Sequence, residues 1–500
     1  MKARRFPFAS RNLKRFTFSR SLPLWVLPVA LLIAGCGGGG SSPSGSGGTG
    51  GGGTPPSGAV TVDFGTQDQL IRGFGGATGF LAQLTTAQAN ALFNPTSGLG
   101  LSILRVMIDP DGENNALPAS AYGYGVNWSA ETGSAGEALA ANPNTIVFAS
   151  PYTPPTSMKL SSTSQPYYSG SPACSPGAGY CGGYLNPADY AAYAAYLNDF
   201  VAYFNANSGT KLYALSMQNE PDYSAQAGEN YESCSWTPAQ MDQWIDAEGS
   251  TLSAPLMMPE STSFDTAQAA PSLSDATAAA AISIVAGHLY MNGESQGTPS
   301  FYSQAVDAGK EVWMTEHYLA PTASYPAQPA IADALNAAEE IHNSMVTGQY
   351  NAYVWYRMWN DTCAYVNYGL IDSGIGGNAT CSNTSAQPKP TYYGYAIGQF
   401  SKFIQPGYHR FNATASPSAG VYVSAYSGSE NGATHYVIVA INAGAGSSSQ
   451  TFTLQGATVS SMTPWQTTST GGLVQQSAVT VSNGSFTSTL PAQSITTFVE

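Results

Sequence analysis

Charged side chains are scarce in this 500-residue chain, which contains only 9% Asp, Glu, Lys and Arg. Cations are the scarcer sign, with 16 Lys and Arg against 30 Asp and Glu, and seven of the cations lie within the first twenty positions. The remaining chain therefore carries nine cations and a strong excess of negative charge. Such a surface repels nucleic acid and anionic lipid, so we expect a neutral or sparsely charged partner and no nucleic acid.

Histidine and cysteine are also rare. The five His and six Cys show no spacing that is typical of a zinc site, so we expect no metal. Two pairs of cysteines are close neighbours in sequence, Cys174 with Cys181 and Cys363 with Cys381. In an oxidising compartment these are the natural disulfide pairs, which would leave Cys234 free.

The N-terminal segment 1–35 has the pattern of a secretion signal. Its seven cations precede an apolar run at 22–34 that is too short to span a membrane comfortably. The run ends in LIAGC, which resembles the bacterial lipoprotein box. We therefore expect a secreted protein that is lipidated at Cys36 and anchored at the bacterial cell envelope, at the outer membrane; an ordinary signal peptide is the alternative. Residues 36–58 are rich in Gly and Ser and predict a flexible linker.

The segment 71–404 alternates short apolar runs with longer Ala-rich helical stretches, as repeated βα units do. Eight runs can be counted, the number of strands in a closed (β/α)8 TIM barrel. They are 70–76, 101–108, 145–150, 211–220, 255–261, 283–290, 310–318 and 351–359. The helical stretches 187–208 and 329–348 each end at or next to glycine, as helices prefer.

Residues 405–500 predict a small antiparallel β-domain, because apolar and polar residues alternate there in short segments separated by Gly, Ser and Asn. The segments with this pattern are 421–428, 434–443, 450–457, 478–484 and 494–500. A strand-like segment, 59–65, precedes the barrel. We expect residues 59–70 to join 405–500, so that both chain ends build a side β-sandwich.

Two glutamates end apolar runs of the predicted barrel. Glu220 closes the fourth run in SMQNEP, and Glu316 closes the seventh in VWMTEHY. Active-site residues of such barrels come from the C-terminal ends of different strands, and a retaining glycoside hydrolase needs two carboxyls about 5–5.5 Å apart. One isolated Glu at a strand end is more often structural. A pair at the ends of two strands favours catalysis of glycoside hydrolysis.

A series of motifs, in this order, resembles glycoside hydrolase family 30, and within it the bacterial glucuronoxylanase subfamily. The resemblance covers nearly all of 60–500. Its motifs include IRGFGG (71–76), SILRV (102–106), FASPYTPP (148–155), SMQNEPDY (216–223), PES (259–261), HLY (288–290), VWMTEHY (312–318), FSKFIQPGY (400–408) and LPAQSITTFV (490–499). The family implies a retaining hydrolase of a polysaccharide, with a barrel, a side β-domain and no cofactor. We expect a monomer.

The resemblance also implies roles for single residues. Glu220 is the expected acid/base and Glu316 the nucleophile, while Asn219 is expected to hold the 2-hydroxyl of the sugar. Tyr290 is expected to donate to Glu316, and Arg105 to add positive charge beside it.

Five further residues are expected to bind substrate. His288 would face the sugar or support its strand, and Tyr318 follows the nucleophile in the TEHY motif. Tyr152 and Trp355 offer flat faces for a sugar ring, although such aromatics are more often core residues. Arg357 is the fifth.

The chain departs from its family after the eighth strand. The subfamily has a stretch shaped like WWYIRRSYG whose arginine and tyrosine hold the glucuronate branch of xylan, whereas this chain has WYRMWNDTCAY at 355–365. Trp359 and Asn360 replace the arginine pair, and Arg357 alone offers the planar fork that suits a carboxylate. Phe80 and Tyr152 stand where the subfamily commonly has tryptophan.

Four functions are therefore compared. The leading expectation is an endo-acting β-1,4-xylanase that does not depend on glucuronate. The alternatives are a branch-dependent glucuronoxylanase or a xylobiose-releasing exo-enzyme, a hydrolase of another β-glycan such as a β-1,6-glucan or galactan, and an inactive surface glycan-binding lipoprotein. Intact Glu220 and Glu316 argue against the last.

Overall fold

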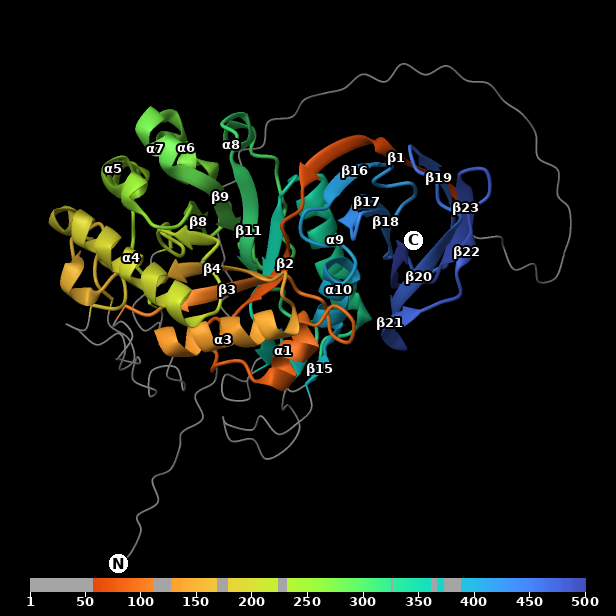
Figure 1. Ribbon diagram of the computed structural model, residues 1–500, viewed down its shortest axis with the longest axis horizontal. Coiled ribbons are helices and arrows are strands. Elements are labelled where there is room, and N and C mark those ends of the chain that lie inside the picture. Colours follow the sequence, from red (N-terminus) through yellow and green to blue (C-terminus); the bar gives the residue numbers. More distant parts are fainter. Residues whose placement is uncertain are drawn as a thin grey trace, which may run out of the picture. The chain divides into compact units, whose positions relative to one another are not determined.

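The computed structural model describes residues 57–110, 127–168, 179–223, 232–324, 327–360, 367–372 and 388–500. Eight parallel strands close into a barrel in the order β11-β12-β2-β3-β4-β7-β8-β9 (Figure 1). All eight predicted runs contribute a strand. The strands are β2 (Gly73–Ala77), β3 (Ile103–Ile108), β4 (Ile146–Pro151), β7 (Ala214–Ser216), β8 (Leu256–Ser261), β9 (Ile282–His288), β11 (Glu311–His317) and β12 (Ala352–Trp355).

Helices follow most barrel strands, and their ends carry the expected caps. Thr85 and Thr237 each form a capping box with the glutamine three residues later, which satisfies two backbone N–H groups that have no partner within the helix. The described helices are α1 (Thr86–Phe93), α3 (Trp128–Ala141), α4 (Tyr190–Asn207), α5 (Pro238–Glu248), α6 (Thr266–Ser274), α7 (Ala276–Ala281), α8 (Ser303–Asp307), α9 (Ile331–Val346) and α10 (Tyr392–Ser401). Among the described residues, no helix is long and apolar enough to cross a membrane.

Side chains fill the inside of the barrel. Phe148 and Trp313 meet edge to face with ring centroids 5.8 Å apart, and small residues such as Ala214 and Ala286 make room for them. Gly75 of β2 is needed for closure, because a Cβ there would lie 2.3 Å from the backbone oxygen of Ile103. The packed interior leaves the strand ends as the place for a site.

A separate sheet is built from both chain ends, as predicted. Its order is β21-β20-β24-β18-β17-β16-β1-β19-β23, and β22 pairs with β20. Figure 1 shows β1, in red, among the blue strands of the C-terminal region. The strands are β1 (Ser57–Leu70), β16 (His409–Ala413), β17 (Val421–Glu430), β18 (Ala433–Asn442), β19 (Ser448–Gln455), β20 (Ser461–Thr468), β21 (Gly471–Gln475), β22 (Val479–Thr480), β23 (Ser485–Leu490) and β24 (Ser494–Val499).

Two details of this sheet correct the sequence prediction. The sheet is mixed and not wholly antiparallel, because β1 pairs in parallel with β19 and antiparallel with β16. The predicted strand at 478–484 is reduced to the two residues of β22. The sheet is fastened to the barrel helices by buried hydrogen bonds, in which Thr497 donates to the backbone and side chain of Gln399 on α10 at 2.7 and 2.6 Å.

Several predictions fall outside the described residues. These are the signal segment, Cys36 and the linker as far as residue 56, together with Cys174, Cys363 and Cys381 of the two predicted disulfide pairs. The last two residues of the predicted linker, Ser57 and Gly58, begin β1 instead. The lipidation and both pairings therefore stay predictions. Cys234 is free and buried, as expected.

Candidate active site

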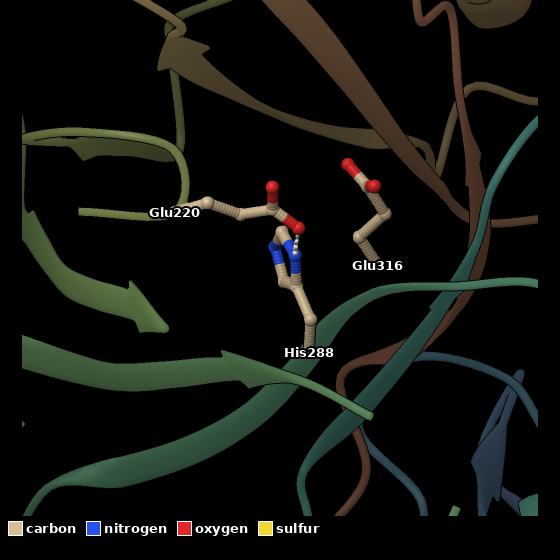
Figure 2. Close-up of side chains that lie close together, drawn as sticks. All are labelled: Glu220, His288 and Glu316. Atoms are coloured by element: carbon tan, nitrogen blue, oxygen red, sulfur yellow. Dashed lines mark hydrogen bonds and ion pairs between the residues drawn. The ribbon is translucent and has the colours of Figure 1, made fainter. Parts of the chain in front are cut away.

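The two predicted catalytic glutamates meet at the C-terminal end of the barrel. Glu316 is the sixth residue of β11, and Glu220 lies four residues beyond the short strand β7. Both are only 6% exposed. One oxygen of each carboxylate and one nitrogen of His288 all lie within 4.8 Å of one another. Figure 2 shows both carboxyl groups reaching toward the same space, with His288 beside Glu220.

Local backbone irregularities aim these side chains. Strand β11 has a register shift after Met314, which brings Glu316 directly beside His288 of β9. Glu220 has a positive φ of 45°, and its N–H donates to the backbone oxygen of Glu260, which has φ 55°. Such conformations are costly for residues other than glycine, and they persist at sites where the surroundings hold them.

Glu316 is surrounded by donors. Arg105 forms an ion pair with its Oε2, Tyr152 donates to the same oxygen at 3.3 Å, and Tyr290 donates to Oε1 at 3.1 Å. Burial and the charge of Glu316 raise the pKa of Tyr290 well above its usual value, so its hydroxyl stays protonated. These contacts fix the orientation of the Glu316 carboxyl group.

Glu220 is held by histidine. Nδ1 of His288 lies 3.0 Å from Oε1 of Glu220. Burial alone would lower the pKa of His288, but the neighbouring carboxylates of Glu316, Glu220 and Glu260 outweigh it and raise the pKa to about 9. His288 is therefore an imidazolium at neutral pH, and its Nδ1 donates to Glu220.

A third carboxylate, Glu260 at the end of β8, lies fully buried beneath the pair. It pairs with Arg105 at 3.2 Å and faces Nε2 of His288 at 3.8 Å. Burial opposes its ionisation, but Arg105, together with His288 and Ser150, lowers the pKa of Glu260 to about 2. Sequence reasoning missed this residue, although it ends a barrel run in the PES motif just as Glu220 and Glu316 end theirs.

The same residues are the candidates for a metal site, because Glu220, His288 and Glu316 bring three ligand atoms together. A protonated imidazole has no lone pair for a metal, and Glu316 is already engaged by Arg105. The donor set therefore suits a carboxylate pair better than a metal centre.

A cleft of 630 Å³ opens above the two glutamates. Its walls are mainly aromatic. The residues that line it are Tyr152, Glu220, Tyr223, Thr262, Tyr290, Gly293, Glu294, Glu316, Tyr318 and Tyr356. The ring of Tyr318 stacks on Tyr368 with centroids 3.9 Å apart, and its hydroxyl donates to Glu294. Sequence reasoning missed Tyr356, which directly follows β12, and Glu294, which ends the short exposed strand β10 (Met291–Glu294) beyond the barrel strand β9.

The remaining predicted residues divide into two groups. Asn219 lies at the site, where its Oδ1 accepts from Arg105 at 2.5 Å, and Tyr152 lines the cleft with its hydroxyl directed at Glu316. Trp355 and Arg357 do not line the cleft. Trp355 is 1% exposed in the core, packed on Tyr393, so it has no face for a sugar ring.

Arg357 is also buried, and its positive charge partly offsets the rise in the pKa of neighbouring Tyr356 that burial causes.

The expectation of a stacking platform at Trp355 is wrong, because β12 turns that side chain outward into the helix layer. Tyr356, the next residue, takes the place at the cleft.

Comparison with known proteins agrees with this geometry. No protein-family model matches the chain. The chain is 35% identical over 443 residues to the glucuronoxylanase XynC of Bacillus subtilis (strain 168), which covers 88% of this chain and 91% of that protein.

Two solved structures are similar at 36% identity. They are the glycoside hydrolase family 30 subfamily 8 xylanase Xyn30A of Clostridium acetobutylicum, with a TM-score of 0.71, and a family 30 endoxylanase of Clostridium papyrosolvens C71, with a TM-score of 0.69. Each match covers 88% of this chain and 99% of the other. The chain belongs to glycoside hydrolase family 30, in the group that these bacterial xylanases and glucuronoxylanases represent.

Proposed function

We propose that this protein is a retaining hydrolase of the β-1,4-xylan backbone, endo-acting and independent of a glucuronate branch. The observation that carries the proposal is a tyrosine-lined cleft over two facing carboxylates that has no cation in its lining. Such a cleft suits a neutral glycan chain.

Retention is supported by the separation of the carboxyl groups. Oxygens of Glu220 and Glu316 lie within 4.8 Å, which is close to the roughly 5–5.5 Å of retaining enzymes and short of the roughly 6.5–9.5 Å that leaves room for water in inverting ones. Glu316, ion-paired with Arg105, is the nucleophile that attacks the anomeric carbon. Glu220 protonates the leaving oxygen and afterwards takes a proton from water.

The charges around the pair favour this division of roles. The buried cluster holds three carboxyl groups, those of Glu220, Glu260 and Glu316. It also holds two cations, Arg105 and His288, so the cluster as a whole is neutral when one of the three carboxyl groups carries a proton. Glu260 stays ionised, because its pKa is about 2. Glu316 accepts from Arg105, Tyr152 and Tyr290, an arrangement that suits the carboxylate that attacks, and Glu220 lies beside His288.

Independence from glucuronate is supported by a count of cations. The nine Lys and Arg beyond position 20 all lie in described segments, and the sequences of the segments between them contain none. None of the nine lines the cleft. Arg105 is engaged beneath it, and Arg357 is 5% exposed.

The residues that replace the subfamily's arginine pair have structural contacts. Asn360 accepts from the N–H of Gly369 at 2.6 Å and donates to Gln328 at 3.2 Å, and Trp359 is buried. A carboxylate branch would therefore meet no guanidinium here.

The similar proteins favour xylan, because one is a glucuronoxylanase and two are xylanases by name. The first of these names also makes branch dependence the specific alternative. A direct test of the retaining reaction is to follow the anomeric configuration of the first product by NMR during hydrolysis of a xylo-oligosaccharide. We expect the β-anomer first; initial release of the α-anomer would contradict the assignment of Glu316.

We also propose that the enzyme works outside the cytoplasm as a monomer held to the outer membrane by lipid at Cys36. The signal-like segment 1–35 and the Gly/Ser-rich linker 36–58 support this. The linker would carry a barrel at 71–404 and a side domain made of 59–70 and 405–500.

A further inference from the structure

A second pocket, of 440 Å³, adjoins the catalytic cleft. Glu294, the last residue of the exposed strand β10 (Met291–Glu294), lines both. Its carboxylate accepts a hydrogen bond from Tyr318, one of the tyrosines that line the cleft. The two pockets are therefore neighbours that share the side chain of Glu294.

The lining of the second pocket is suited to hydroxyl groups. Besides Glu294 it includes the carboxamides of Gln296 and Asn336, with Leu319 and Ala320 forming an apolar floor. Its volume is within the range of small-molecule sites, about 300–1,000 Å³. A mixture of amide, carboxylate and short apolar groups offers both donors and acceptors to a sugar.

A buried hydroxyl also lines this pocket. Tyr393 of α10 is 1% exposed, and its hydroxyl has no hydrogen-bond partner among the described residues. Burial, followed by the charges of Asp333 and Glu340, raises the pKa of Tyr393, so the hydroxyl keeps its proton. A buried donor without a partner is costly, and a ligand oxygen in the pocket would satisfy it.

The negative charge around the second pocket disfavours sugars that carry a carboxylate. None of its lining residues is a cation, Glu294 carries a negative charge at its edge, and the carboxylates of Asp333 and Glu340 act on Tyr393 from behind. A uronate would be repelled here, whereas a neutral sugar would not.

We propose that this second pocket is an additional glycan subsite, which binds a neutral sugar unit of the chain that is cleaved in the catalytic cleft, with Glu294 accepting from hydroxyl groups on both sides. The inference rests on the proposed function only in taking that sugar to be part of a neutral xylan chain.

The test compares substrates of two lengths. Ala320 is exposed and lines the pocket, and its backbone N–H donates to the backbone oxygen of Glu294 at 2.8 Å. Ala320→Phe places an aromatic ring in the pocket without removing that bond. The matched control is Ala202→Phe, at an exposed alanine of α4 outside both pockets.

We expect Ala320→Phe to leave kcat/KM for an aryl β-xylobioside within about twofold of the wild type and to lower it about tenfold for xylohexaose, the worth of one or two neutral hydrogen bonds. Ala202→Phe should change neither. Tyr393→Phe keeps the ring and removes only the hydroxyl. It should lower kcat/KM for xylohexaose severalfold and should change neither kcat/KM for the aryl β-xylobioside nor the thermal stability.

If kcat/KM for xylohexaose is the same in the wild type, Ala320→Phe and Tyr393→Phe, the subsite is ruled out and the proposed function stays intact. If the wild type cuts no xylan, the proposed function fails. The same comparison is then made with short and long oligomers of the β-glycan that it does cut, and a length-dependent loss in Ala320→Phe would still support the subsite.

Discussion

His288 and Glu220 are joined by a buried hydrogen bond of 3.0 Å, in which the imidazolium of the sixth barrel strand supports the acid that follows the fourth. The pKa of His288 is raised from 6.5 to about 9, so its contribution to stability is complete below pH 6.5 and is lost as the pH rises through 9. The wild type should therefore lose up to about 3 kcal/mol of unfolding free energy over that range.

The measurement is urea unfolding at pH 6 and pH 9.5 for the wild type and His288→Gln. The two proteins should differ at pH 6 and converge at pH 9.5. His435→Gln, a partly exposed histidine of β18, is the control and should follow the wild type. A constant difference between the wild type and His288→Gln at both pH values would contradict the assignment.

Glu260→Gln tests the buried charge beneath the catalytic pair. Removing one of the two carboxylate partners of buried Arg105 leaves Glu316 as its remaining partner and should lower stability by up to about 3–5 kcal/mol. Loss of the carboxylate should also lower the pKa of His288 and move the alkaline limb of the activity profile to lower pH.

Glu131→Gln is the matched control, because Glu131 is equally buried but burial raises its pKa to about 8, so that it is neutral at pH 7. Its replacement should cost no more than about 1 kcal/mol. Equal losses in the two variants would mean that burial and not charge explains the effect of Glu260.

The catalytic glutamates should give different signatures. Glu316→Gln should fold normally and lose several orders of magnitude of activity, because an amide cannot attack the anomeric carbon. Glu220→Ala should regain cleavage of substrates with good leaving groups when azide is added, giving a β-glycosyl azide. Wild-type turnover in purified Glu316→Gln, or an α-azide product, would remove these roles.

Much of this site was predictable from the sequence, and the reasons are physical. Apolar runs that end in a polar residue mark barrel strands and their catalytic ends, which is how Glu220 and Glu316 were found. The same rule applies to Glu260, but a single fully buried carboxylate does not indicate its partners. Trp355 was misplaced because the direction of a side chain at the end of β12 depends on how that strand closes the barrel.

Residues beyond the barrel strands account for most of what was missed. Tyr356 directly follows β12 and Glu294 ends the short, exposed strand β10, where the sequence has no apolar period of two or of 3.6 to indicate which way a side chain points. The parallel pairing of β1 with β19 was also beyond the sequence, because alternation predicts that a strand exists and not which neighbour it takes.

Membrane tethering is tested by Cys36→Ser. The substitution should move the protein from the membrane fraction to the soluble secreted pool, because acyl chains and not the Gly/Ser-rich linker supply membrane affinity. Retention of Cys36→Ser in the membrane fraction would mean that the apolar run at 22–34 is itself the anchor.

We propose that the cleft binds a neutral xylan backbone without the help of a charged branch. A bidentate contact between arginine and glucuronate is worth about 1.5–3 kcal/mol, so its loss should erase one to two decades of preference for branched substrate. Arg357→Ala should leave the ratio of the two activities unchanged, because Arg357 is buried beside Tyr356 and lies outside the cleft lining.

The most direct measurement is therefore kcat/KM on glucuronoxylan and on linear xylan, together with mass spectrometry of the products. We predict similar values on both substrates and cuts that are not positioned relative to the glucuronate. Products that each carry one glucuronate at a fixed place, together with resistance of linear xylo-oligosaccharides, would contradict the account.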